Sequence, residues 1–312
     1  MRDVVVIGGG LTGLSACFQL EKSNLRYTVI ELKRRFGGSI RSASENGFIM
    51  DSSAFAFSSL ADEPWLPELG LTDQLLPLSA DAFIFRSGTE SLIRALAAKL
   101  PGGRLMRMAL SSIGRHRRRF TICLENGLMY DAGALILAVP ARYAARMLYN
   151  LAPAAAKRLA NCQYESIWQV ALGFHKRDLP RSLPAANNLG FSYLLSTDYL
   201  GRVPDRDHLL IQLALPARAD IPPADISRLA ADRLGIAAPP IASRAQVTCA
   251  PLSIDDLRLI RALLPDGIIL VGSDYLPEPP AQPGLARLAQ RMEAGRGAAR
   301  EALQFLKANR RQ

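Results

Sequence analysis

Histidine and cysteine are both scarce in this chain of 312 residues. Three histidines and four cysteines occur, namely His116, His175, His208, Cys17, Cys123, Cys162 and Cys249. No two of them have the spacing of metal ligands and no Cys-x-x-Cys pair is present, so the sequence predicts no metal site and reduced, buried thiols. A Gly-x-Ser-x-Gly nucleophile turn and a Walker loop are missing too, which argues against a hydrolase or a kinase.

Long hydrophobic runs are also missing. The longest apolar stretch without a charge or a proline falls well short of the roughly twenty residues of a membrane-spanning helix, so we expect no transmembrane segment. Arg2 precedes an apolar stretch, as in a signal peptide, but Asp3, the glycines that follow and Glu21 fit a strand and a helix better. The sequence therefore predicts that a folded domain starts at residue 1 and that the protein is cytoplasmic.

Acidic residues are fewer than basic ones, 28 against 38, which gives a net charge of +10. The densest basic run, Arg115-His116-Arg117-Arg118-Arg119, is predicted to be a solvated turn. Interleaved aromatic residues and a known nucleic-acid-binding module are absent, so we expect no nucleic-acid partner. An anionic membrane surface or a carboxylated substrate remains open as a partner for this charge.

Glycines are concentrated in the turn Gly8-Gly9-Gly10-Leu11-Thr12-Gly13. The turn follows an apolar, β-branched run at residues 4–7, which predicts a buried strand, and precedes apolar residues at helical spacing up to residue 24. A strand, a glycine turn and a helix in this order are typical of a dinucleotide site. Gly8 allows the tight turn, Gly10 lets the backbone approach a pyrophosphate, and Gly13 lets helix and strand pack closely.

An acidic residue stands where such a site needs one. Residues 26–30 are predicted to form the second strand, and Glu31 ends it, eighteen residues beyond Gly13. A carboxylate at this position accepts hydrogen bonds from ribose hydroxyls and disfavours a 2′-phosphate. The alternative is a structural α/β turn that binds no ligand.

The segment Arg35-Phe36-Gly37-Gly38-Ser39-Ile40-Arg41-Ser42 resembles the flavin amine oxidase and protoporphyrinogen oxidase superfamily. In that family the acid is followed by a Gly-Gly-Arg-x-x-Ser/Thr element that passes the FAD phosphates; here Ser39 takes the place of the arginine. The resemblance implies FAD as the cofactor. No cysteine stands in a matched flavin-attachment motif, so noncovalent FAD is expected.

Further segments carry the same resemblance. Residues 47–57 are similar to the family's strand and its Asp-x-Gly continuation, with Ser53 in place of a glycine that lies close to the flavin ring in relatives. Residues 87–92, 134–140, 270–275 and 292–299 resemble four more family segments, the last of them the closing helix. The residues that the resemblance implies for FAD binding are Gly8, Gly10, Leu11, Thr12, Gly13, Glu31, Leu32, Gly37, Gly38, Arg41, Ser42, Ser53, Leu110, Gly272, Ser273, Asp274 and Leu288.

The expected fold is α/β: a Rossmann-like FAD-binding domain of the GR2 flavoprotein type and a second, antiparallel-sheet substrate domain. We assign residues 1–57, 84–150 and 255–312 to the FAD-binding domain, and residues 58–83 and 151–254 to the substrate domain. Within the first domain, strands are expected at 107–113, 120–125, 128–131 and 134–140, with Asn126-Gly127 as a hairpin turn. A helix is predicted over 220–234 and another from Gly284 onward. Relatives insert a far longer helical cap at 58–83, so the cap here is much reduced.

Candidate catalytic groups are few, which is compatible with flavin chemistry because the cofactor itself accepts the hydride. Phe55, Phe57 and Tyr275 are candidates for the wall beside the flavin, with core packing as the alternative. No lysine stands in a matched amine oxidase motif. Arg291 occupies a position where relatives have a small residue, and either alters the approach to the ring or points to solvent.

The resemblance implies a soluble FAD-dependent oxidoreductase that oxidises an amine or a porphyrinogen-like compound and is reoxidised by oxygen or another acceptor. The short cap favours a renalase-like oxidation of a dihydronicotinamide instead. A third hypothesis is a binding or regulatory protein that keeps the FAD fold without turnover. The substrate, the electron acceptor and the oligomeric state are not specified by the sequence.

Overall fold

The computed structural model of the protein describes residues 2–53, 57–58, 64–79, 82–217, 221–222, 224–254, 256–276 and 287–310. Its largest sheet consists of β1 (Arg2–Ile7), β2 (Tyr27–Glu31), β8 (Gly103–Met106), β9 (Leu110–His116), β10 (Arg119–Leu124), β11 (Met129–Leu137) and β16 (Ile268–Leu270). The strand order is β8-β2-β1-β11-β10-β9, with β16 also paired to β11. The pairs among β8, β2, β1, β11 and β16 are parallel, whereas β9, β10 and the start of β11 form an antiparallel meander.

Helices cover both faces of this sheet, as the apolar run of β1 requires. Val4 and Val6 pack in one core with helices α1 (Leu11–Lys22), α3 (Glu90–Ala98) and α8 (Leu288–Arg310). Val5 and Ile7 point to the other face and pack with α4 (Ala141–Leu148), α5 (Pro153–Ala160) and α7 (Leu257–Ala262). Alternate residues of one strand thus stabilise two helical layers, which is the architecture of a Rossmann-like α/β domain.

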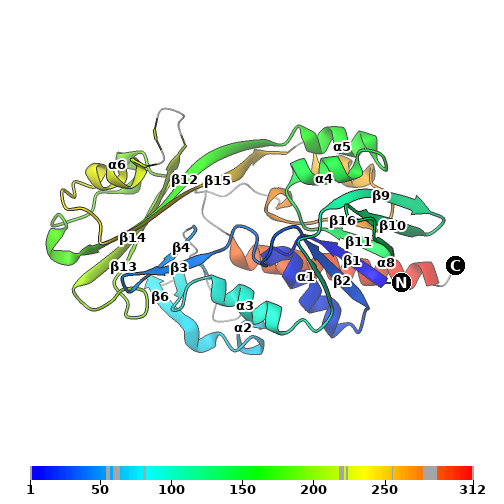
Figure 1. The fold of residues 1–312 in the computed structure, drawn as a ribbon, viewed down its shortest axis with the longest axis horizontal. Helices are drawn as coiled ribbons and strands as arrows, with labels where there is room; N and C mark the ends of the chain where they lie inside the picture. The colour runs from blue at the N-terminus through cyan, green and yellow to red at the C-terminus, as the bar shows by residue number, and fades with distance from the viewer. Residues whose placement is uncertain are drawn as a thin grey trace.

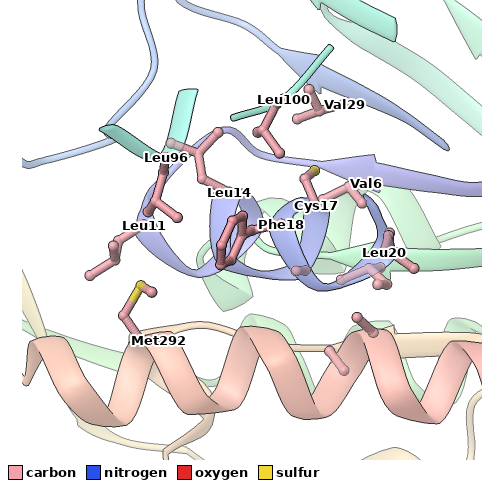
Figure 2. Packing of buried hydrophobic residues seen from close by; sticks show 14 of the residues in the cluster. Val6, Leu11, Leu14, Cys17, Phe18, Leu20, Val29, Leu96, Leu100 and Met292 are labelled. Atoms are coloured by element: carbon pink, nitrogen blue, oxygen red, sulfur yellow. The ribbon is translucent and has the colours of Figure 1, made fainter. Parts of the chain in front are cut away.

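Helix α8 returns from the far end of the chain to lie along α1 (Figure 2). Phe18 and Leu11 of α1 and Met292 of α8 belong to one buried cluster. A Cβ atom at Gly295 would lie 2.3 Å from the carbonyl oxygen of Thr12, so only glycine lets the two helices approach this closely. The N-terminal and C-terminal segments are therefore joined in a single core.

A second, four-stranded antiparallel sheet lies beside this body, and its long strands β12 and β15 extend toward it (Figure 1). Its order is β13-β14-β12-β15, with the bounds β12 (Gln163–His175), β13 (Tyr193–Thr197), β14 (His208–Pro216) and β15 (Ala242–Ser253). Helix α6 (Ile226–Arg233) packs on one face of it through Ile226 and Ala230. The opposite face is left for contact with the Rossmann-like body.

Smaller elements lie between β2 and β8 in the sequence. They are β3 (Ser42–Glu45), β4 (Phe48–Asp51), β5 (Phe57–Ser58), α2 (Trp65–Glu68), β6 (Leu75–Ser79) and β7 (Ala82–Phe85). Short 3₁₀ turns are η1 (Thr72–Gln74), η2 (Lys176–Asp178), η3 (Ala186–Leu189) and η4 (Ser273–Tyr275). In the described part of residues 58–83, α2 and η1 are the helical elements, in keeping with the short cap.

The structure corrects several predicted boundaries. The strand expected at 107–113 starts at Leu110, because Arg107 has a left-handed φ of 57° that separates β8 from β9. The strands expected at 128–131 and 134–140 are one strand, β11, which pairs first with β10 and then with β1. The helix expected over 220–234 is the shorter α6, and α8 is described from Leu288, with Gly284 outside the described residues.

Candidate cofactor and substrate site

The candidate cofactor site lies at the carboxyl edge of the parallel strands. Because β2, β1, β11 and β16 run in parallel, their last residues reach the same edge of the sheet. Glu31 is the last residue of β2. The residues that come after β1, β11 and β16 include Gly8, Ala138 and Gly272, respectively. Ligands of open α/β sheets bind outside this edge, so the structure brings the predicted glycine turn, the acid and the segment 272–274 to one place.

Within the glycine turn, a side chain would be unfavourable at Gly8, Gly9 and Gly13 for a different physical reason at each position. Gly8 has a φ of 104°, and a Cβ there would lie 2.3 Å from the carbonyl oxygen of Ala138. A Cβ at Gly13 would lie 1.9 Å from the carbonyl oxygen of Gly8, so the helix presses directly on the turn. Gly9 is a position that the sequence reasoning missed, yet a Cβ there would lie 2.4 Å from the ring of Phe36.

Gly10 differs from its neighbours because no protein atom crowds it. It is the N-cap of α1 with φ −72°, and a Cβ would meet only Gly38 Cα, at 3.9 Å. Gly10 itself has no side chain that could cap this helix end. Its first backbone N–H groups are therefore available to an anion, as a pyrophosphate site at a helix N-terminus requires.

The second glycine element lies directly against the first. The N–H of Gly37 donates to the carbonyl oxygen of Gly9 at 2.8 Å, and Gly10 forms a β-bridge with Gly37. Gly37 and Gly38 have φ values of 106° and 60°, which glycine adopts at low cost. Two segments that are separate in the sequence thus form one backbone cradle.

Glu31 is buried at the base of this cradle. Its Oε2 accepts from the N–H of Gly9 at 2.7 Å and its Oε1 from the N–H of Lys33 at 2.8 Å. A carboxylate has further lone pairs, so these two bonds leave it able to accept from a ribose hydroxyl. Leu32, the next residue, is 65% exposed beside it.

Several predicted site residues have side chains that are engaged within the protein. The Ser42 hydroxyl donates to Asp51 Oδ1 at 2.5 Å and accepts from the N–H of Glu90 at 3.0 Å. Asp274 Oδ2 accepts from the N–H of Ala141 at 2.9 Å, at the start of α4, and from the Tyr164 hydroxyl. The Asp274 carboxylate therefore stabilises the fold around the site.

Of the three aromatic residues predicted to line the wall beside the flavin, the structure shows the side-chain environment of Tyr275 alone. Tyr275 is buried in the core below the sheet and its hydroxyl donates to the carbonyl oxygen of Val139 at 3.1 Å, which favours the packing alternative. Burial raises its pKa well above the usual value. Phe55 lies outside the described residues, and Phe57 is described only as part of β5.

The remaining predicted contacts lie on or near the carboxyl edge. Leu11 and Thr12 form the first turn of α1, Leu288 is buried at the start of α8, and Leu110 is half-buried at the start of β9. Arg41 is exposed and Ser53 is half-buried, next to the buried Ser52. The N–H of Arg41 donates to Ser52 Oγ at 3.0 Å, so the second glycine element and the segment 51–53 are tied together.

The face of the second sheet that turns toward the cofactor domain is the one opposite α6, and we call it the inner face. Gln246 Nε2 donates to the carbonyl oxygen of Ser52 at 2.7 Å, and Gln212 Nε2 to that of Asp51 at 3.4 Å. Gln169 is paired in register with Gln246, so its side chain lies on the same face. The sequence did not specify this face.

Gln169 is a residue that the sequence reasoning missed. It is 3% exposed; its Oε1 accepts from the Tyr193 hydroxyl, and its Nε2 donates to Thr248 Oγ1 at 3.3 Å. A glutamine in the apolar part of β12 was the available signal, because a buried amide is retained only where its hydrogen bonds are made. The middle of the inner face is thus polar and hydrogen-bonding.

A buried ion pair joins the two parts of the site. Arg202 precedes β14 and is fully buried; its Nη1 donates to Asp51 Oδ2 and to the carbonyl oxygen of Phe85, each at 3.0 Å. Asp51 also accepts from the N–H and the hydroxyl of Thr89, both at 2.9 Å. This pair fixes the end of β4, immediately before Ser52 and Ser53.

Arg291 lies in the first turn of α8 and is half-buried rather than fully exposed to solvent. Its Nε is buried and has no hydrogen-bond partner among the described residues. Burial, with the charge of Arg287, lowers the pKa of Arg291 to about 10, and Asp274 opposes this shift. The guanidinium is still charged at neutral pH, so the protein bears the cost of a half-buried cation whose Nε makes no hydrogen bond to the described residues.

Replacing Arg291 with methionine is expected to stabilise the cofactor-free protein by about 1–2 kcal/mol, because the half-buried charge is removed. The Arg291 guanidinium binds its proton more tightly in the unfolded state than in the folded state. The destabilisation by the charged Arg291 is therefore fully present below about pH 10 and declines only above it. The increase in the free energy of unfolding, measured with urea, should therefore be equal at about pH 6 and pH 8.5. Arg300→Met, at an exposed position of the same helix, is the control, and a loss of stability in Arg291→Met would contradict the interpretation.

Family models match most of the chain's first three quarters. Residues 6–69 match an NAD(P)-binding Rossmann-like domain, and residues 71–234, just over half of the chain, match the flavin containing amine oxidoreductase family. The chain belongs to the flavin-containing amine oxidoreductase family. Membership supports a flavin cofactor and an oxidoreductase function.

Individual relatives of this chain match shorter segments. Protoporphyrinogen oxidase 2 of Arabidopsis thaliana is 32% identical over 128 residues, which is 40% of this chain and 24% of that protein. Coproporphyrinogen III oxidase of Bacillus subtilis is 37% identical over 62 residues, 18% of this chain and 13% of that protein. The matched segments thus span a quarter or less of these relatives' length.

The fold of this chain is also similar to that of solved structures. Cyclohexylamine oxidase from Brevibacterium oxydans superposes with a TM-score of 0.71 over 98% of this chain and 99% of that chain, at 13% identity. This likeness confirms the expected arrangement of a Rossmann-like domain with an antiparallel sheet. No helix in the described ranges combines the length and the apolar character needed to cross a bilayer.

Proposed function

We propose that this protein binds FAD noncovalently and transfers a hydride from an amine or a porphyrinogen-like compound to flavin N5, with oxygen or another acceptor restoring the cofactor. The observation that carries the proposal is the cradle formed by Gly9, Gly10, Gly37 and Gly38. Gly10 leaves space in front of an uncapped helix, which is what a pyrophosphate needs. The buried Glu31 provides the acceptor for ribose hydroxyls.

Each part of the chain would have a distinct role. The first turn of α1 would hold the pyrophosphate, and the turn at Gly272 and Ser273 would hold the flavin end of the cofactor. The polar inner face, with Gln169 and Tyr193 at its centre, would orient the substrate. We propose that residues 151–254, together with 58–83, form the substrate domain, whose sheet excludes water from the reacting atoms.

A second candidate is the oxidation of a dihydronicotinamide, which the short segment 58–83 favours. In its described part, this segment has α2 and η1 as its helical elements. Anaerobic stopped-flow reduction with amines, porphyrinogens and reduced nicotinamides separates the two candidates. A flavin that stays oxidised with every donor would instead support a binding protein without turnover.

The first test is an absorbance spectrum of the purified native protein before and after acid denaturation. We expect flavin absorption in the native protein and its release into solution on denaturation, because no covalent attachment is proposed. Flavin that stays with the precipitated chain would contradict noncovalent binding. A colourless protein that takes up no added FAD would overturn the proposed function.

A further inference from the structure

Arg244 lies at the junction of the inner face and the cofactor cradle. Arg244 pairs in register with Ala171 of β12. Gln246 is two residues further along β15, so the side chains of Arg244 and Gln246 lie on the same face of the sheet. Gln246 donates to the carbonyl oxygen of Ser52, and Ser52 Oγ donates to the carbonyl oxygen of Ser39 at 2.7 Å. Arg244, which is half-buried, therefore lies on the face that is linked through Gln246 and Ser52 to the segment that follows Gly37 and Gly38.

Two more arginines occupy this place. Arg35 donates through Nη1 and Nη2 to the carbonyl oxygens of Phe36, Ile40 and Gly38, at 2.9 to 3.0 Å, so its charge is fixed inside the second glycine element. Burial lowers the pKa of Arg35, and the charges of Arg41 and Arg244 lower it further, while Glu90 and Glu31 act against them. Three cations from two parts of the fold thus share one region.

These three cations lack ion-pair partners in the described part of the chain, although Glu90 and Glu31 lie close enough to act on Arg35. Among the described residues, none of Arg35, Arg41 and Arg244 takes part in an ion pair. On the inner face, Glu165 lies six residues along β12 from Ala171, which is about 20 Å by strand rise. Cations that repel one another and have no ion-pair partner are costly, and an anion placed among them lowers that cost.

We propose that Arg244 binds an anionic group, a phosphate or a carboxylate, at the junction of the inner face and the cradle. The inference rests on the proposed function, which supplies the source of that anion. The source is either the FAD pyrophosphate or an acidic group of the substrate. An arginine is suited to both because its planar guanidinium bonds phosphate and carboxylate oxygens in pairs. A cationic substrate such as a diamine finds no countercharge at this position.

The test compares Arg244→Gln, Arg244→Lys and Arg228→Gln with the wild type. Arg228 is an exposed arginine of α6, on the other side of the sheet, and serves as the matched control. Binding of inorganic pyrophosphate and of citrate is measured by calorimetry at low ionic strength, on both the apo-protein and the FAD-loaded protein. We expect Arg244→Gln to weaken anion binding about tenfold or more, Arg244→Lys to restore part of it, and Arg228→Gln to leave it unchanged.

The two forms of the protein separate the two sources. If FAD supplies the anion, pyrophosphate binds the apo-protein, FAD loading abolishes its binding, and Arg244→Gln also weakens FAD. If the substrate supplies it, the FAD-loaded protein still binds pyrophosphate or citrate through Arg244, and FAD affinity is unchanged. Equal affinities in wild type and Arg244→Gln, or no anion binding by either form, would overturn the proposal.

Failure of the proposed function gives a different pattern. A chain that takes up no FAD fails the spectral test, but its apo-protein still reports whether Arg244 binds pyrophosphate or citrate. Circular dichroism and thermal unfolding of each variant establish that it is folded. Arg244→Lys keeps the positive charge and changes the shape of the side chain less than Arg244→Gln does. Loss of anion binding in Arg244→Gln with recovery in Arg244→Lys therefore assigns the effect to the cation.

Discussion

Gly10→Ala is expected to remain folded and to lose FAD affinity by about 10- to 100-fold, whereas Gly13→Ala is expected to lose stability itself. The backbone at Gly10 has an ordinary φ, and its new methyl group would meet no atom closer than 3.9 Å, so the group would fill only the space in front of the helix. At Gly13 the methyl group would lie 1.9 Å from a backbone oxygen, at a cost on the order of 3 kcal/mol or more. Urea unfolding of both apo-proteins and FAD titration measure the two effects.

Gly127→Ala is the control for these glycine variants. Gly127 forms the turn between β10 and β11, and a methyl group there would have no neighbour within 4 Å, so only its φ of 81° makes alanine unfavourable. A moderate loss of stability with unchanged FAD affinity is expected there. If Gly10→Ala bound FAD as tightly as the wild type, the space in front of α1 would not be the pyrophosphate site.

The parts of the site that could be predicted are those encoded within a short stretch of sequence. Strand, glycine turn, helix and Glu31 all lie within the first 31 residues, where local periodicity and turn chemistry decide the structure. The return of residues 270–275 to the same edge came from the family resemblance. Both expectations agree with the strand pairing, since β16 lies in parallel beside β11.

The parts that could not be predicted depend on contacts between distant residues. The inner face of the second sheet is decided by α6, which covers the other side, and nothing in the alternation of β12 indicates which side that is. Arg202 is 151 positions from Asp51, and a single arginine in a sequence is usually a surface residue. Gly133 allows β11 to continue because Leu306 of α8 packs against it, which is again a distant contact.

Arg202→Met is expected to lower the free energy of unfolding by about 3–5 kcal/mol, because it leaves the Asp51 carboxylate buried without its cation. The side chains of the pair are 0% and 2% exposed, so water cannot replace the lost partner. The hydrogen bonds from Ser42 and Thr89 remain, but they do not neutralise the charge. Urea unfolding of the apo-protein measures the loss, and Lys176→Met, which breaks the exposed pair with Asp198, should cost less than about 1 kcal/mol.

The double variant Asp51→Asn/Arg202→Met decides whether the pair acts as a unit. Because the amide introduced by Asp51→Asn is neutral, removal of Arg202 would no longer leave a buried charge, so the double variant should be more stable than the sum of the two single losses predicts. Strict additivity would mean that Arg202 stabilises the fold through the carbonyl oxygen of Phe85 and through packing instead. Since Asp51 directly precedes Ser52 and Ser53, FAD affinity is expected to fall in both single variants and to recover in part in the double variant.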